Sequence, residues 1–152
     1  MHGAACGRLA DYLQSHKEPL VNQWLAQARM DSGVQSDSLT KRELVDHLPN
    51  IVDAMIQALR QRCSDTTMEH VQEITARHIV IRWVQRYDLP EVVREVSLLR
   101  AECNRHLLIF DDAGMDARLL NSTTMYRILD GIVMDATDTY LSLRARRDGD
   151  GA

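Results

Sequence analysis

The chain has 152 residues, which suits one domain with a substantial buried core, and only 5% of them are aromatic while 26% are charged. The formal net charge is −4, and Lys and Arg are scattered except at the C-terminus, so the sequence shows no basic patch of the kind that binds nucleic acid or anionic membranes. No apolar run approaches the roughly 18 residues of a membrane-spanning helix, the N-terminus lacks a signal-peptide pattern and the cysteines show no paired spacing, so we expect a cytoplasmic protein with reduced thiols.

Helix-forming residues dominate the composition. Ala, Leu, Arg, Gln and Met are frequent, whereas Gly and Pro number only 7 and 3. The sequence therefore predicts an all-α single domain of about six helices. We place this domain at residues 1–147 and a flexible tail at residues 148–152, which read Asp-Gly-Asp-Gly-Ala.

Two short helices are predicted first. Residues 4–15 show a weak amphipathic pattern, and Lys17-Glu18-Pro19 then restarts the chain. In the second helix, apolar residues recur at helical spacing around Trp24, which we expect to be buried in the core. Residues 31–38 are rich in turn-forming residues and predict a surface loop.

Two further helices are predicted on either side of Pro49. Thr40 and Glu43 have the spacing of a capping box, which marks a helix start. Pro49 cannot donate a backbone hydrogen bond to the preceding turn, so we expect it to kink or restart the helix. The restarted segment carries an apolar stripe and ends near residues 62–63.

The helix at residues 68–87 is predicted to be the most buried element. Val71 and Ile74 lie on one of its faces at helical spacing, and Val80 and Trp83 fall on the opposite face. Because a helix that is apolar on two faces must be covered on both, we expect other helices to surround this one.

An abrupt stop follows. Asp88 can cap the next helix, Pro90 fits in its first turn, and Glu91 completes a capping-box spacing with Asp88. Two long helices joined by so short a connection are expected to pack as an antiparallel hairpin.

The last long helix is expected to begin between residues 116 and 123, after a break at residues 111–114. Its apolar residues follow steps of three, four and seven, close to the spacing of a coiled-coil seam: Met125, Leu129, Ile132, Ala136 and Leu143. We expect part of this stripe to pair two subunits in a homodimer, in which the C-terminal helices pass a change in packing to an output module. The alternative is a monomer whose last helix closes its own core.

Three polar residues lie in the apolar setting around the connection at Asp88. His78 and Arg82 are one helical turn apart, and Glu95 lies early in the next helix. Unpaired buried charges would cost several kcal/mol each, so we expect a hydrogen-bonded ion-pair network. This network either only fixes the helix register, or it lines a pocket in which His78 or Arg82 changes state when a ligand or a proton arrives.

The same region resembles a known family, the N-terminal domain of RsbRD-type RsbT co-antagonists, which is also the sensory module of many bacterial sensor histidine kinases. The resemblance rests on His78, Arg82, Tyr87-Asp88-Leu89, Glu95 and Leu98-Leu99-Arg100. The family pattern is roughly His-Gly-x-x-Arg, a short gap, Tyr-Asp, and then Glu-Tyr-x-x-Leu-Arg. Ile79 stands where the family usually has Gly, and Val96 stands where it usually has an aromatic residue.

The resemblance implies an all-α, globin-like or helical-bundle input domain for signal transduction, without catalytic activity of its own. Such a domain would act on a protein partner or an attached output module, either a histidine kinase or a stress-response regulator. Its signal would be a small ligand or another cue that the sequence does not identify. The signature polar network would consist of four residues: His78, Arg82, Glu95 and Arg100.

Two alternatives depend on histidines. A globin-like fold would also suit a sensor that binds a small ligand or haem, although no haem-pocket signature accompanies any histidine here. A histidine phosphotransfer module is a small helical protein too, but its phosphorylated histidine is exposed and usually followed by Lys-Gly. His78 is followed instead by Ile-Val-Ile. We therefore expect no cofactor, with haem as the open alternative.

Metal-binding and enzyme signatures are weak. Cys103 and His106 lie near one face of a helix, as two metal ligands would, but structural zinc needs four ligands and no complementary pair occurs at ligand spacing. We expect Cys103 to be a small buried residue and predict no metal site. The sequence also lacks a Gly-rich phosphate loop, a Gly-x-Ser-x-Gly elbow and a His-Glu-x-x-His motif, which favours a protein that is not an enzyme.

Overall fold

The computed structural model describes residues 2–31, 39–110 and 114–150, and the side chains of residues 5 onward within those ranges. Every regular element in these ranges is a helix, which confirms the predicted all-α fold. The helices are α1 (His2–Ser15), α2 (Lys17–Met30), α3 (Lys41–Val45), α4 (Leu48–Arg60), α5 (Asp65–Val84), α6 (Leu89–Ile109) and α7 (Met115–Asp150). The loop predicted at residues 31–38 lies almost wholly outside the described residues.

Side-chain caps set several of the helix boundaries. The Thr40 hydroxyl accepts a hydrogen bond from the backbone N–H of Glu43 at 3.2 Å, and the backbone N–H of Thr40 donates to the Glu43 carboxylate at 3.0 Å. Asp88 and Glu91 form the same reciprocal pair at the start of α6. Both predicted capping boxes are therefore present, and each satisfies backbone donors that a helix start leaves free.

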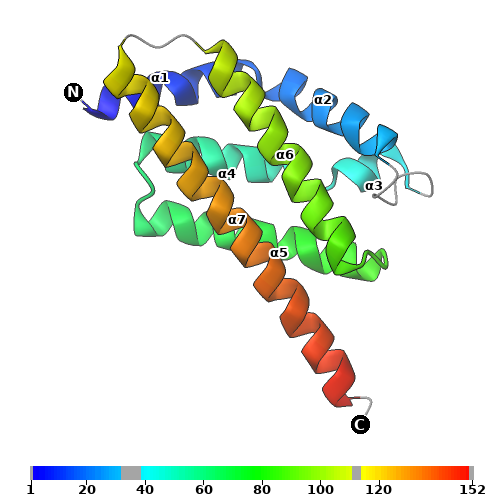
Figure 1. The fold of residues 1–152 in the computed structure, drawn as a ribbon. Coiled ribbons are helices and arrows are strands. Elements are labelled where there is room, and N and C mark those ends of the chain that lie inside the picture. The colour runs from blue at the N-terminus through cyan, green and yellow to red at the C-terminus, as the bar shows by residue number, and fades with distance from the viewer. Residues whose placement is uncertain (1, 32–38, 111–113, 151–152) are drawn as a thin grey trace.

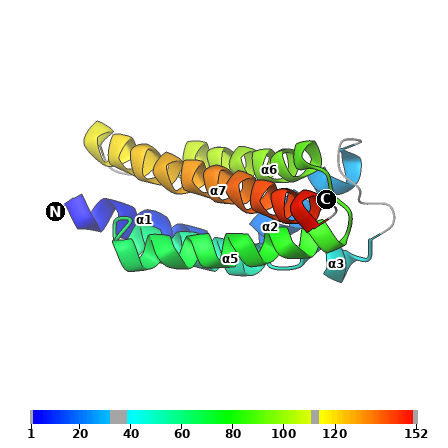
Figure 2. The ribbon, with the colours of Figure 1, turned by 90° about the horizontal axis from the view of Figure 1, so that it is seen from below.

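The helices form two layers. α6 and α7 lie across α4 and α5 in Figure 1, and the view from below separates α6 and α7 from α5 and α1 (Figure 2). α7 packs on α5, α1, α6 and α4, whereas α6 packs on α7 and α2. The predicted antiparallel hairpin of α5 and α6 is wrong, because these helices diverge after their short connection and each packs mainly on other elements.

The most enclosed helix is α4, not α5 as the sequence predicted. α4 packs against α1, α5, α2 and α7, and most of its side chains are buried. α5 has its main contacts with α7 and α4, so its outer face stays open: Val80 and Val84 are 41% and 71% exposed. Trp24 is 1% exposed in the core, as predicted.

α7 begins at Met115, just before the expected range, and is helical as far as Asp150. Residues 151–152 of the predicted tail lie outside the described residues, so the tail stays a prediction. Four residues of the proposed dimer seam are buried inside this chain's own core: Met125, Leu129, Ile132 and Ala136. Leu143 is half-buried, near the C-terminal end of the same helix. The apolar stripe therefore closes the core, which was the alternative to a seam.

Candidate functional site

Glu95 of α6 meets two side chains of α5 in the interior. The Nε of Arg82 donates to Glu95 Oε1 at 2.7 Å, and the Nε2 of His78 lies 3.4 Å from the same oxygen. Arg82, Glu95 and His78 are only 0%, 3% and 5% exposed. Three of the four predicted network residues therefore meet, as the sequence indicated.

Arg82 also holds α3 in place. Its Nη1 donates to the backbone carbonyl of Glu43 at 3.0 Å and to Gln85 Oε1 at 2.6 Å, and its Nη2 donates to the carbonyl of Leu44. These carbonyls belong to α3, a helix too short to satisfy its own C-terminal acceptors. One buried guanidinium therefore joins α3, α5 and α6.

A second carboxylate lies on the other side of His78. Asp46 Oδ2 is 2.9 Å from His78 Nδ1 and also 2.9 Å from the Nδ1 of the neighbouring His47. Asp46 follows the last residue of α3 with a backbone φ of 44°, a conformation that side chains with a Cβ rarely adopt. The short connection between α3 and α4 thus holds this carboxylate against His78 in a strained backbone.

Neighbouring groups set the protonation of His78 and Asp46. Burial alone would lower the pKa of His78, but the hydrogen bonds to Asp46 and Glu95 outweigh burial and raise this pKa above its usual value. Burial would likewise raise the pKa of Asp46, yet hydrogen bonds from His78 and His47 bring it down to about 2. His78 therefore lies between the Glu95 carboxyl group and the Asp46 carboxylate, whose low pKa keeps it ionised.

Tyr87 connects this network to α7. The guanidinium carbon of Arg82 lies 4.8 Å from the centre of the Tyr87 ring, and the backbone carbonyl of Tyr87 accepts a hydrogen bond from the Tyr140 hydroxyl at 3.1 Å. Tyr140 packs edge-on against Trp83, and the guanidinium of Arg147 lies over the same Trp83 ring at 5.2 Å. The end of α5 and its connection to α6 thus contact the last third of α7.

Arg100 does not join the network. Its Nη1 contacts Asp130 of α7 at 2.7 Å in a solvent-exposed ion pair, and its guanidinium lies 5.3 Å from the centre of the Tyr126 ring. The fourth signature residue therefore links α6 to α7 at the surface, and its predicted membership of the buried network is wrong.

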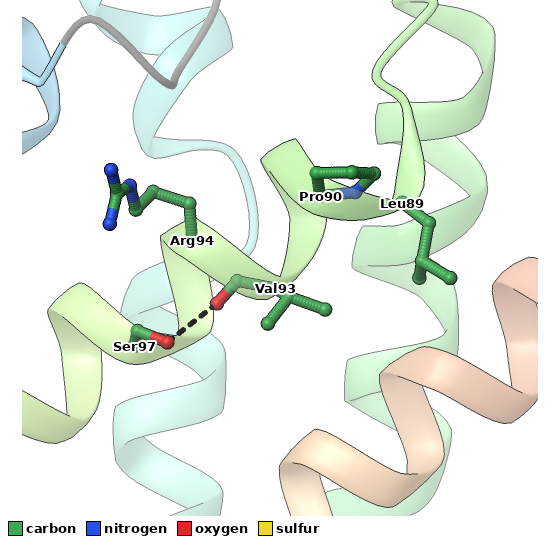
Figure 3. A pocket seen from close by; sticks show the side chains of 5 residues that line it. All are labelled: Leu89, Pro90, Val93, Arg94 and Ser97. Carbon is green, nitrogen blue, oxygen red and sulfur yellow. Dashed lines mark hydrogen bonds between the residues drawn. The ribbon is translucent and has the colours of Figure 1, made fainter.

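A surface hollow of about 530 Å³ lies over the first turns of α6 (Figure 3). Its lining is Leu89, Pro90, Val93, Arg94 and Ser97, and the Ser97 hydroxyl donates to the carbonyl of Val93 at 2.9 Å. All five residues come from one helix, so the hollow lacks the polar groups converging from several elements that mark a small-molecule site.

A second hollow, of about 470 Å³, lies beside the polar network. Its lining is His47, Glu73, Ala76, Arg77, Val80 and Ile81. Neither His78 nor Arg82 lines it. This hollow is therefore not a pocket that either side chain faces directly. His47 both lines the hollow and contacts Asp46, so the hollow borders the polar network.

Cys103 and His106 lie apart from this network. Cys103 is buried, and burial raises the pKa of its thiol to about 12, as expected for a small core residue. His106 is 3% exposed, and its Nδ1 lies 3.2 Å from the Tyr12 hydroxyl. Among the described residues they do not belong to a group of three possible metal ligands.

Sequence inspection missed Asp46 and His47. Asp46 is 32 positions from His78, and their meeting depends on the packing of the short helix α3, which no periodicity reveals. The available signal was local: an Asp-His pair just before Pro49, at the break between two predicted helices. Polar residues at such breaks are held by backbone geometry, and functional residues often lie there.

Most of the chain matches a known protein family. Residues 18–152, which run from α2 to α7, match the family described as RsbT co-antagonist protein rsbRD N-terminal domain. No curated protein sequence and no solved structure matches the chain significantly. Among the described residues, no helix is both long enough and apolar enough to cross a bilayer.

Proposed function

Because this chain belongs to the RsbRD N-terminal domain family, we propose that it is a signal-input domain without catalytic activity that acts on other proteins through its last helix. The observation that carries the proposal is the geometry of α7, whose first two thirds close the core while its C-terminal turns extend beyond the other helices (Figure 1). A helix fixed at one end and projecting at the other can transmit a small change in packing.

The contacts of Tyr140 support a route for such a change. Tyr140 is 7% exposed and bonds to the backbone at Tyr87, whose ring lies against Arg82. A change at the buried charges would therefore alter contacts at Tyr87 first and then those of α7. This sequence of contacts connects the signature residues to the projecting helix.

The proposed partner is an output module, either a histidine kinase or a stress-response regulator, attached to α7 or encountered as a separate protein. We also propose a homodimer, now through the outer face of α7, because Met134 and Leu141 are seven residues apart and 64% and 36% exposed. The three buried, unpaired cysteines fit a reducing cytosolic setting.

A chimera tests the transmission proposal. Residues 1–147 are fused in continuous helical phase to the catalytic part of a sensor histidine kinase, and autophosphorylation is measured. Inserting one residue after Arg147 rotates the kinase by about 100° and should change the rate, whereas inserting seven residues, two full turns, should restore it. Tyr140→Phe should shift the rate at least twofold. Tyr126→Phe, a change of the same kind on an exposed face of α7, should leave it unchanged.

Equal rates for the parent and for both insertions would contradict transmission through α7. Circular dichroism of each chimera must show the parent's helix content, so that a lost signal is not mistaken for an unfolded domain.

The haem-binding alternative has one supporting observation. His106 is buried, its Nε2 has no hydrogen-bond partner among the described residues, and burial lowers the pKa of His106, which favours the neutral ring. His106 would therefore be the iron ligand, because both ring nitrogens of His78 face carboxylates. A Soret band that appears on adding haem and disappears in His106→Ala would support this alternative. Phosphotransfer at His78 is disfavoured because its side chain is buried.

A further inference from the structure

Three potential metal ligands converge at the connection between α3 and α4. They are Asp46, His47 and His78. Each offers one ligand atom, and these three atoms lie within 4.8 Å of one another. Asp46 Oδ2 is 2.9 Å from the Nδ1 of each histidine. His78 comes from α5, so the group joins two parts of the fold rather than one short stretch of sequence.

The position between His78 and Asp46 requires a cation. The Nε2 of His78 faces Glu95 Oε1, a carboxylate oxygen that can only accept, so this nitrogen carries its hydrogen. The Nδ1 of His78 faces Asp46 Oδ2, which is also an acceptor. A lone pair on Nδ1 would meet a second lone pair there. Either a proton or a metal ion must therefore lie between the two atoms.

The surroundings of His78 are those of a metal-bound histidine. Histidines that bind metals usually donate their other ring N–H to a carboxylate, which fixes the ring and strengthens the ligand. Glu95 provides that carboxylate, and Arg82 fixes Glu95 with a 2.7 Å bond. The strained φ of 44° at Asp46 shows that the fold holds this carboxylate in place at an energetic cost.

We propose that Asp46, His47 and His78 bind a divalent transition-metal ion, with Zn²⁺ as the reference ion. Two imidazoles and one carboxylate suit zinc and its neighbours in the first transition series rather than Mg²⁺ or Ca²⁺, which prefer oxygen ligands. Three protein ligands leave a coordination position open for water or a small anion. The site borders solvent, because His47 lines the hollow of about 470 Å³ and the Asp46 side chain is 16% exposed.

Only a modest rearrangement is needed. Zinc bonds of about 2.0 to 2.1 Å in a tetrahedron place the ligand atoms roughly 3.3 Å apart. The two 2.9 Å contacts would lengthen slightly. His47 has the freedom to complete the geometry, because its side chain is 30% exposed.

Metal binding at this site does not require the proposed role of α7. It is measured without a partner or an output module, so either proposal can be overturned while the other stands.

Calorimetric titration of the folded chain with ZnCl₂ is the first test. The parent should bind one Zn²⁺ per chain, and His47→Gln should weaken this affinity at least tenfold. His70→Gln removes a histidine from the exposed face of α5 and is the matched control, so its affinity should equal that of the parent. Absence of stoichiometric binding in the parent, or an unchanged affinity in His47→Gln, would overturn the proposal.

A second measurement identifies the ligand atoms directly and needs no variant. In histidine ¹⁵N NMR spectra, one equivalent of Zn²⁺ should shift the Nδ1 signals of His47 and His78 and leave the Nε2 of His78 protonated. Shifts confined to other histidines would show a surface site elsewhere and would overturn the assignment. Thermal unfolding of His47→Gln, monitored by circular dichroism, should match that of the parent before metal is added, because this side chain is 30% exposed and glutamine can still donate to Asp46.

Discussion

Arg82 is a fully buried charge, and each nitrogen of its guanidinium donates at least one hydrogen bond. It bonds to one carboxylate, one side-chain amide and two backbone carbonyls, and its guanidinium also faces the Tyr87 ring. A long planar cation can do this where α5 and α6 diverge, because it reaches from α5 to both α3 and α6. A lysine has a single ammonium and could not replace these directed bonds.

Removal of the Glu95 carboxylate should leave this cation buried without a counter-charge. We expect Glu95→Ala to lower the free energy of unfolding by about 3–5 kcal/mol, measured by urea denaturation. The control is Glu73→Ala, which removes an exposed carboxylate from a surface pair with Arg77 and should cost about 0.5 kcal/mol or less. Equal stabilities for Glu95→Ala and the parent would show that the interior does not depend on this pair.

The cysteines should be unreactive in the folded protein. Cys6, Cys63 and Cys103 are buried, and burial raises the pKa of Cys63 as well as that of Cys103. A thiol with a raised pKa stays protonated near pH 8, and the thiolate is the nucleophile. A thiol-specific dye should therefore label none of the three without denaturant and all three in guanidinium. Rapid labelling of the native chain would indicate that the core opens.

These residues also show how far a sequence can predict a site. His78, Arg82 and Glu95 were grouped correctly because the short connection at Asp88 brings them together, even though the hairpin itself was wrong. Arg100 belongs to the family pattern, but its position on the helix excludes it from the buried network. It follows Glu95 by five residues, a rotation of about 140° on a helix, so it had to face away from Glu95.

Among the elements, α6 has the clearest start. The Asp88 side chain accepts from the backbone N–H of Glu91 at 2.9 Å. We expect Asp88→Ala to destabilise the domain by about 1 kcal/mol in urea denaturation. Asp88→Ser retains an oxygen that can accept the same bond and should cost much less. Identical losses for the two variants would mean that the cap contributes little.

α7 shows the limit of reading a stripe of apolar residues. Met125, Leu129 and Ile132 have the spacing of a coiled-coil seam, but the same spacing appears wherever a helix covers its own domain. The pattern reveals which face is buried and not what buries it. The capping boxes were predictable because their hydrogen bonds are local, whereas the partner of a face depends on the whole fold.

Ile132 should therefore behave as a core residue. It is 1% exposed, and we expect Ile132→Ala to lower the free energy of unfolding by about 2–5 kcal/mol in chemical denaturation. Met134→Ala, two residues along at a position that is 64% exposed, should change it by no more than about 0.5 kcal/mol. A small loss of stability in Ile132→Ala with a large loss in Met134→Ala would show that the opposite face of α7 is buried.

For the whole molecule, the fold class was predictable and the arrangement was not. Composition and capping residues predicted the helices, because helix propensity and capping depend on neighbouring residues in the sequence. The enclosure of α4 rather than α5 depends on how α7 crosses both helices, and no segment of the sequence alone contains that information. The contact of Asp46 and His47 with His78 was hidden for the same reason.

Two copies of the chain are expected to associate as a homodimer. Sedimentation equilibrium at micromolar concentration should give a mass twice the 17.3 kDa of one chain. Met134→Glu should shift the chain toward monomer with its helix content preserved, because the change lies on the outer face of α7. Glu73→Lys changes charge at an exposed position on α5, in a hollow that no α7 residue lines, and should leave the dimer intact. A monomer mass for the parent would rule out the dimer.

The position of α7 also affects how the domain is made. It contains 36 residues and covers parts of α1, α4, α5 and α6, so those helices leave the ribosome before the element that completes their core. At about 5–20 residues per second, synthesis of α7 alone takes roughly 2–7 s. During these seconds the nascent chain exposes apolar side chains of four helices to chaperones. Stalling or truncation within α7 should therefore lead to degradation or aggregation rather than to a smaller folded domain.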